Sequence, residues 1–265
     1  MENYVNMGLI TDLLSVPSET FDEWDMVFFL SKYLDKMDYE YDVDEYGNIF
    51  VTKGDASKKP LVCAHIDTVH KKTTINIREV WLPRTSCYGQ KYDQNETLLC
   101  LKGYGDDGNE TGCGGDDKCG IYVCLELLKR VENIKVAFFV SEEIGCIGSS
   151  KCDADFFNDV EYVVSYDGPG NRLVTEVCNG VRVFDRDSKF FEVVSKTFDE
   201  INYEPVYGNH PYTDIYMIKK RFNIDGVNLS CGYYNMHSPS EYVCVDDLNK
   251  AIDTGLNLIR NLSEN

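Results

Sequence analysis

Short apolar runs alternate with amphipathic helical segments along the whole of this chain, and this alternation constrains its fold more than any other feature. The runs at residues 60–65, 135–141, 161–166 and 224–229 have the length of buried strands. Helical patterns separate them, which is typical of βα units. We therefore predict a three-layer α/β/α sandwich with a mostly parallel central sheet, formed as one domain by residues 1–265.

Apolar periodicity and capping residues predict where the other elements lie. An amphipathic pattern indicates a short helix at residues 5–15, and Ser18 is the expected N-cap of a second helix that buries Phe28. Asp187 and Asp246 are the expected caps of two later helices. Further helices are expected at residues 118–131, 149–157 and 213–220, a β-hairpin at 39–52, and strands at 71–77, 97–101, 173–177 and 181–184.

Polar side chains follow several of the predicted strands at the point where each strand ends, and one more opens a helix. They are His65, Asp67, Asp116, Glu142, Glu143 and Asp167. In open α/β sheets, ligands bind in the crevice outside the carboxyl ends of the strands. Carboxylates gathered there repel one another, so burying them together requires cations. The sequence therefore predicts a metal site at this edge of the sheet.

The spacing of these residues suits different tasks. His65 and Asp67 are two apart in an extended segment and so lie on one face, where the aspartate can orient the imidazole from behind. Glu142 and Glu143 are adjacent at a strand end, where the chain turns sharply. One of them can face a metal ion while the other reaches a water molecule between metal and substrate.

The charge balance excludes two classes of partner. Forty-five acidic residues against 26 basic ones give a net charge of −19, which argues against nucleic acid and anionic membranes. No apolar run reaches the ~18 residues of a membrane helix, and the first four residues have no secretory pattern. The 11 cysteines include no pair with the spacing of a zinc knuckle. We expect reduced thiols and a cytoplasmic protein.

Five short motifs, taken in order, resemble those of the co-catalytic two-zinc exopeptidases, a family that includes peptidase T, the aminoacylases and the single-domain zinc aminopeptidases. The motifs are AHIDTV at residues 64–69, GGDDKCG at 114–120, SEEIG at 141–145, DG at 167–168 and MHSPSE at 236–241. The resemblance implies hydrolysis of short peptides with two zinc ions per chain. Manganese or cobalt could take the place of zinc.

The resemblance also implies a role for each motif residue. The implied metal ligands are His65, Asp116, Glu143, Asp167 and His237, with the aspartate at 116 bridging the two ions. Asp67 would orient the first histidine. Glu142 would be the general base that takes a proton from the attacking water and later gives it to the leaving amine. The peptide bond after the bridging aspartate is expected to be cis.

The chain departs from the peptidase T branch in one respect. That branch carries a lid and dimerisation domain between the fourth and fifth motifs. Here the interval is 237 − 167 = 70 positions, already filled by predicted elements, so we expect no lid and a plausible monomer. The groups that a lid supplies must then come from elsewhere. His210 and Tyr212 are the candidates for stabilising the oxyanion, and a plain polar loop before a helix explains them equally well.

Three functions remain open on the sequence alone. An aminopeptidase acting on short peptides is the leading one, because an acidic cleft attracts a free amino terminus, with Asp117 or Asp214 as the expected acceptor of its ammonium. A deacylase or carboxypeptidase would need a basic residue for the substrate carboxylate, and Arg172 and Arg182 could supply it. A catalytically idle metal-binding module would be favoured by the loss of a motif residue, and none is lost.

Overall fold

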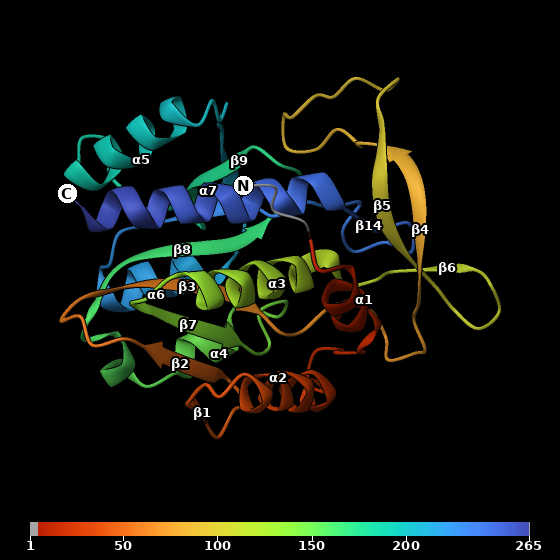
Figure 1. The fold of residues 1–265 in the computed structure, drawn as a ribbon, viewed down its shortest axis with the longest axis horizontal. Coiled ribbons are helices and arrows are strands. Elements are labelled where there is room, and N and C mark those ends of the chain that lie inside the picture. Colours follow the sequence, from red (N-terminus) through yellow and green to blue (C-terminus); the bar gives the residue numbers. More distant parts are fainter. Residues whose placement is uncertain (1–4, 265) are drawn as a thin grey trace.

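The computed structural model describes residues 5–264, and a nine-stranded sheet forms its frame (Figure 1). The strands follow the order β1-β2-β7-β3-β8-β12-β9-β10, and β11 pairs with β9. Their bounds are β1 Tyr41–Val43, β2 Ile49–Lys53, β3 Lys59–His65, β7 Ile134–Phe139, β8 Val160–Gly168, β9 Leu173–Cys178, β10 Val181–Arg182, β11 Val206–His210 and β12 Gly226–Ser230. The first four residues, on which the expectation about a secretory signal rests, lie outside the described residues.

The centre of this sheet is parallel. Strands β7, β3, β8 and β12 pair in parallel, whereas β1, β2 and β10 add antiparallel pairs toward the edges. The hairpin expected at residues 39–52 is present as β1 and β2. Because the central strands point the same way, their carboxyl ends meet at one edge of the sheet. Residues that are far apart in the sequence therefore come together there.

Helices cover both faces of the sheet, which confirms the predicted three layers. Their bounds are α1 Met7–Ser15, α2 Trp24–Lys36, α3 Gly115–Arg130, α4 Ile147–Lys151, α5 Lys189–Glu200, α6 Asp214–Phe222 and α7 Val245–Ser263, with a 3-10 turn at Ala154–Phe157. Buried residues of α1, α2, α3, α5 and α7 share one hydrophobic core, while Ile218 of α6 and Phe157 belong to the core on the other face. Within residues 5–264, every helix is too short or too polar to cross a membrane.

Strand β3 shows why an unbroken apolar run in the sequence correctly predicted a buried strand. Successive side chains on a strand point to opposite faces. Leu61 and Cys63 pack into one core, and Val62 and Ala64 pack into the other. Because helices cover both faces, every position of the strand is buried, and no polar alternation is needed.

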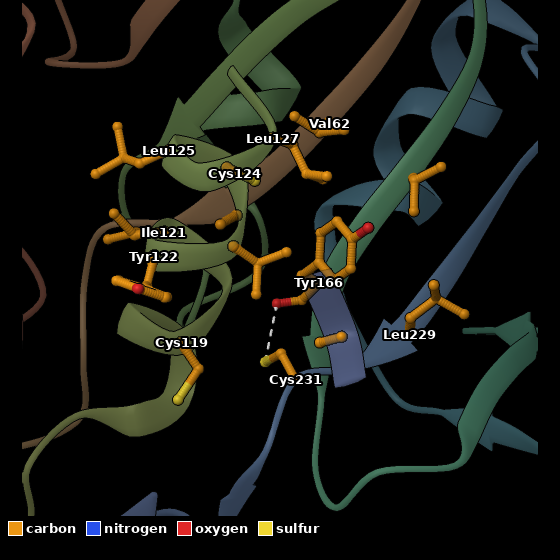
Figure 2. Close-up of a cluster of buried hydrophobic side chains, with 14 of the residues drawn as sticks. Val62, Cys119, Ile121, Tyr122, Cys124, Leu125, Leu127, Tyr166, Leu229 and Cys231 are labelled. Atoms are coloured by element: carbon orange, nitrogen blue, oxygen red, sulfur yellow. Dashed lines mark hydrogen bonds between the residues drawn. The ribbon is translucent and has the colours of Figure 1, made fainter. Parts of the chain in front are cut away.

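The core beneath α3 brings the start of this helix close to the end of β8 (Figure 2). The thiol of Cys231 donates to the main-chain carbonyl of Tyr166 at 3.4 Å. A Cβ atom on Gly120 would lie only 2.2 Å from that carbonyl oxygen, so a larger residue would push the helix away. The first turn of α3, which carries Asp116, is thereby held against the strand ends.

A second sheet, which the sequence analysis did not predict, lies at one end of the molecule, on the right in Figure 1. Its order is β13-β14-β5-β4, with β6 pairing with β5. Its strands are β4 Asn76–Pro83, β5 Thr97–Tyr104, β6 Glu110–Thr111, β13 Tyr233–Tyr234 and β14 Tyr242–Cys244. We call it the accessory sheet. It joins a segment between the first two motifs to the segment around the last one.

Several local predictions were wrong at the ends of helices. Helix α2 begins well after Ser18, because the main chain at that residue pairs with the segment that follows β3, and Phe28 is 64% exposed. The side chain that caps α5 is Ser188 and not Asp187, since its hydroxyl accepts the third N–H of the helix. Helix α7 begins one residue before Asp246. The helix expected at residues 149–157 is split into α4 and the 3-10 turn.

Candidate metal centre

Polar side chains from several elements meet at the carboxyl ends of the central strands. His65 is the last residue of β3, Glu142 and Glu143 follow β7, Asp167 lies at the end of β8, Asp116 lies in the first turn of α3, and His237 follows β13. The structure thus brings together all five of the predicted metal ligands and the predicted base. The strand-end positions of His65, Glu142, Glu143 and Asp167 predicted this meeting point, because parallel strands end at the same edge, whereas His237 was predicted from the resemblance alone.

Asp116 lies between two histidines. Its Oδ1 is 3.1 Å from Nε2 of His65, and its Oδ2 is 3.2 Å from Nε2 of His237. Each carboxylate oxygen faces a different imidazole, which is the arrangement that one carboxylate shared by two cations requires. The peptide bond between Asp116 and Asp117 is cis, as the resemblance implied.

Further carboxylates complete the cluster. Glu143 lies 3.1 Å from Nε2 of His237, and Oδ1 of Asp167 lies 3.8 Å from Nε2 of His65. Oε2 of Glu142 is 4.0 Å from the same nitrogen of His65. Two sets of three residues have ligand atoms close enough to hold a metal ion: His65, Asp116 and Glu143, and His65, Glu142 and Asp167. Glu142 therefore lies where it can act as a ligand or as a base.

The protein alone does not balance the negative charge of this cluster. Burial raises the pKa of Glu142 to about 8; His65 opposes the rise, and nearby carboxylates add to it. Burial also raises the pKa of Asp167 well above its usual range. Hydrogen bonds to Asp116 and Glu143 raise the pKa of His237 to about 10. Groups with raised pKa values release protons when a cation binds, and histidine with carboxylates is a donor set that zinc binds. The residues fit divalent metal ions.

Asp67 holds two parts of the cluster at once. Its main-chain carbonyl is 2.9 Å from Nδ1 of His65, and its Oδ1 is 3.4 Å from the same nitrogen. Its carboxylate also accepts the main-chain N–H of Glu142 at 2.8 Å and that of Glu143 at 3.3 Å. Asp67 is fully buried. It therefore orients the imidazole, as expected, and also fixes the turn that carries both glutamates.

Glu241 positions the main chain of Asp116, a role that was not predicted from the sequence. Its buried carboxylate accepts the main-chain N–H groups of Gly114 at 2.6 Å and of Asp116 at 3.2 Å, and it lies 2.9 Å from Nε2 of His70. These contacts tie the loop that enters α3 to the segment after β13. The feature of the sequence that could have identified Glu241 is its place in the MHSPSE motif, which also carries His237.

A cleft of about 520 Å³ opens over the cluster. Its floor includes four carboxylates, those of Asp116, Glu142, Glu143 and Asp167. Its walls include Tyr88, Ile144, His210, Tyr212 and Met236. The sequence placed His210 and Tyr212 at the site, and both line this cleft. Tyr88 was missed because it belongs to the loop between β4 and β5, far from every motif.

The imidazole of His210 is fixed in one tautomer. Its Nδ1 contacts the main-chain carbonyl oxygen of Tyr212, which can only accept, so Nδ1 carries the proton. Its Nε2 is buried without a partner. Burial lowers the pKa of His210, so the ring is neutral and Nε2 is an acceptor. This geometry disfavours donation from His210 to an oxyanion and makes the Tyr212 hydroxyl the better donor of the two.

The two arginines considered for a substrate carboxylate do not line the cleft. Arg172 pairs with Glu204 at 3.3 Å, and Arg182 pairs with Glu176 at 2.6 Å. Among the described residues that line the cleft there is neither lysine nor arginine. The basic side chain that a deacylase or carboxypeptidase would need for the substrate carboxylate is thus not found among these lining residues.

The two aspartates expected to accept the substrate ammonium are also placed elsewhere. Asp117 is fully buried and accepts the main-chain N–H groups of His65 at 3.2 Å and of Gly120 at 3.0 Å. Asp214 is buried and accepts the hydroxyl of Ser149 at 2.5 Å. Neither lines the cleft, so this expectation was wrong. Both carboxylates instead accept hydrogen bonds inside the protein, around the site.

Solved structures of peptidases share this fold. The aminopeptidase PepT from Bacillus cereus is 15% identical, with a TM-score of 0.74 over 97% of both chains. A tripeptidase from Staphylococcus aureus is 13% identical, with a TM-score of 0.75 over 98% of both chains. The TET1 peptidase of Pyrococcus horikoshii, described as assembling into a tetrahedron or a large octahedral shell, is 15% identical, with a TM-score of 0.66 over 96% of this chain and 98% of that one. No curated protein matches the chain in sequence.

The shared fold and the cluster of histidines and carboxylates define a class, the metal-dependent peptidases. The model of peptidase family M20/M25/M40 matches residues 61–261, about three quarters of the chain. The chain belongs to this family. The matched region contains all five predicted metal ligands, and the resemblance to the two-zinc exopeptidases is confirmed at the level of family and fold.

Proposed function

We propose that this chain is an aminopeptidase that releases the amino-terminal residue of short peptides. The observation that carries the proposal is the lining of the cleft, which has four carboxylates and no lysine or arginine among its described residues. A carboxypeptidase or an N-acyl amino acid deacylase must hold a substrate carboxylate, and charge-assisted bonds from basic side chains are the usual means. A free amino terminus needs only an acceptor, and the carboxylates of the cleft are acceptors.

Two zinc ions are the proposed cofactor, with manganese or cobalt as possible substitutes. The residues that would hold them are His65, Asp116, Glu143, Asp167 and His237. Two such ions lower the pKa of a water molecule between them and polarise the scissile carbonyl. Asp116 is the proposed bridge because each of its oxygens already faces a different histidine.

Glu142 is the proposed general base. Its carboxylate reaches the floor of the cleft, and Asp67 fixes its main chain from behind. It would take the proton of the attacking water and deliver it to the nitrogen of the leaving amine, so that one side chain serves both steps. The Tyr212 hydroxyl, which lines the cleft, would donate to the oxyanion.

The setting of the enzyme is also proposed. Residues 1–265 would act as one catalytic domain, in the cytoplasm, because 11 cysteines without a paired spacing are typical of a reducing compartment. The expectation of a monomer gains no support, because a peptidase of the same fold, TET1, assembles into large shells.

A set of three peptides tests the proposed specificity. The zinc-loaded protein is incubated with Leu-Gly-Gly, with the same peptide acetylated at its amino end, and with the same peptide amidated at its carboxyl end, and released leucine is measured. We expect turnover of the free and amidated peptides and none of the acetylated one. The Glu142→Gln variant serves as the blank for contaminating peptidases. Hydrolysis of N-acetyl-leucine with the free peptide untouched would replace this function by the deacylase.

A further inference from the structure

Tyr88, which forms one wall of the cleft, lies at the tip of a two-residue turn. Cys87 and Gln90 exchange both main-chain hydrogen bonds, at 3.3 and 2.8 Å. Between them, Tyr88 and Gly89 have φ angles of 46° and 79°. Positive φ at both central positions is typical of a type I′ turn. A bulky aromatic residue adopts it only where the surrounding structure enforces it, so the position of Tyr88 is imposed by its setting.

Gln90 supplies that setting. Its buried side chain accepts the main-chain N–H groups of Asn171 at 3.0 Å and of Arg172 at 2.8 Å, and it donates to the carbonyl of Pro169 at 3.0 Å. These three residues follow directly after the strand end that carries Asp167. The turn is therefore anchored to the same strand end as a metal ligand, which fixes its distance from the reacting atoms.

The ring of Tyr88 stacks on the ring of His210. Their centroids are 5.9 Å apart and their planes are inclined by 16°. His210 is itself held by its contact with the Tyr212 carbonyl, and both rings line the same cleft. The two rings thus form one preorganised unit that presents an aromatic surface.

Large apolar side chains gather at the rim of this cleft. Tyr88 is 38% exposed, Ile144 44% and Tyr212 46%, and Met236 lies beside them in the lining. Apolar side chains left open to water around a small polar floor mark a site for an apolar group of a ligand.

The charged residues of the lining point the same way. No lysine or arginine lines the cleft within the described residues. An acidic side chain of a substrate would therefore find no opposite charge from the protein there, whereas an apolar one loses nothing by leaving water.

We propose that Tyr88 is a specificity-determining residue whose ring, backed by His210, is the wall against which a large apolar side chain of the substrate packs. The inference rests on the proposed function, because an aminopeptidase holds the amino-terminal residue of its substrate in the cleft that Tyr88 lines. The enzyme then prefers peptides that begin with phenylalanine or leucine to peptides that begin with alanine or glycine.

The test compares Phe-Gly-Gly with Ala-Gly-Gly as substrates of the zinc-loaded wild type and of Tyr88→Ala and Tyr88→Phe. We expect the wild type to prefer Phe-Gly-Gly in kcat/KM. Tyr88→Ala should lower that preference about tenfold or more, mainly through KM, which is the size expected for part of an apolar pocket. Tyr88→Phe keeps the ring and should keep the preference. Trp81→Ala is the matched control, since Trp81 is a 68% exposed aromatic residue of the same sheet outside the cleft.

Each other outcome overturns the proposal. If the wild type cleaves both peptides equally well, or if Tyr88→Ala slows both by the same factor, the ring does not select side chains. A hundredfold fall of kcat for Tyr88→Phe on both substrates would show that the hydroxyl acts on the reacting atoms instead. Melting temperatures establish that the variants fold. If the wild type hydrolyses only acylated substrates, the proposed function fails, and the same ratio measured on N-acetyl-phenylalanine and N-acetyl-alanine still tests the wall separately.

Discussion

The metal centre and the accessory sheet contribute to the same cleft but differ in how the sequence encodes them. The predicted metal ligands lie in short motifs, and contacts between the motifs hold them, since Asp67 accepts the main-chain N–H of Glu142 at 2.8 Å and Glu241 accepts that of Asp116 at 3.2 Å. The accessory sheet pairs distant segments, with Cys100 of β5 opposite Cys244 of β14, and it brings Tyr88 to the cleft through the loop between β4 and β5. The difference is that motifs carry the candidate ligands, whereas no motif carries Tyr88.

The two regions also differ in how they balance buried charge. At the metal centre, burial and neighbouring carboxylates raise the pKa values of Glu142 and Asp167. Behind the accessory sheet, the buried Asp247 accepts two hydrogen bonds from Arg84 at 2.7 and 2.9 Å, one from Tyr234 at 2.7 Å and one from Asn171 at 2.8 Å. The first region needs added ions to be complete, and the second is complete in itself. Variants in each region test this contrast.

The largest effect is expected for Asp116→Ala. Removing the carboxylate that faces both histidines should release both metal ions and reduce peptidase activity to the background of the assay. Metal content by mass spectrometry and activity are measured on the same preparation. Asp42→Ala, at an exposed aspartate of β1, is the control and should change neither. A variant that keeps two ions per chain would remove the bridging role of Asp116.

The next effect separates chemistry from metal binding. Glu142→Gln keeps the shape of the side chain and removes its basicity, so we expect both metal ions to stay while kcat falls about 10²–10⁴-fold. Glu143→Gln should instead lower the metal content, because Glu143 contacts His237 at 3.1 Å. Loss of metal from the Glu142 variant would assign that residue to the set that contains His65 and Asp167.

The fold was predictable from the sequence where helices cover a strand on both of its faces. Unbroken apolar runs such as β3 and β7 indicated strands buried on both faces, and they are. The strand predicted at residues 97–101 is present within β5, but the one predicted at 71–77 overlaps β4 only at its first two residues. Strand β4 is partly exposed along its whole length, and its pairing with β5 spans a long polar loop. The cap of α5 was missed by one residue because Asp187 and Ser188 are both good caps, and only the geometry decides between them.

The site was predictable to the extent that motifs carry it. All the predicted ligands meet, and Asp67 contacts His65 as expected. The walls of the cleft were not predictable, because Tyr88 reaches it through a turn fixed by the side chain of Gln90. The tautomer of His210 depends on a carbonyl two residues later, which no sequence pattern reveals.

The third prediction concerns the buried pair of Arg84 and Asp247 behind the accessory sheet, whose charges balance without added ions. Arg84→Met leaves the buried carboxylate of Asp247 without its cation, and we expect the free energy of unfolding to fall by about 3–5 kcal/mol in denaturant titrations. The control is Arg182→Met, because Arg182 pairs with Glu176 while 66% exposed, and such surface pairs contribute only about 0–1 kcal/mol. The metal content should be unchanged in both variants. Equal destabilisation by the two substitutions would contradict the contrast between the regions.

The smallest expected effect is the pH dependence of the difference in unfolding free energy between the wild type and Arg84→Met. Burial raises the pKa of Asp247, but hydrogen bonds from Arg84 and its neighbours outweigh burial and hold the pKa below its usual range. This carboxylate therefore stabilises the fold above its unfolded pKa of about 3.9, and the contribution is lost as the pH falls through the lower folded value.

In Arg84→Met, burial acts on Asp247 without the opposing cation, so the pKa should rise and acid should relieve the buried charge. The stability gap between wild type and variant, measured with EDTA to remove metal linkage, should therefore be widest near pH 7 and narrow below about pH 4, by about 1.4 kcal/mol for each unit by which the two pKa values differ. A gap that stays constant from pH 7 to pH 3 would mean that Arg84 acts through packing of its side chain and not through the charge of Asp247.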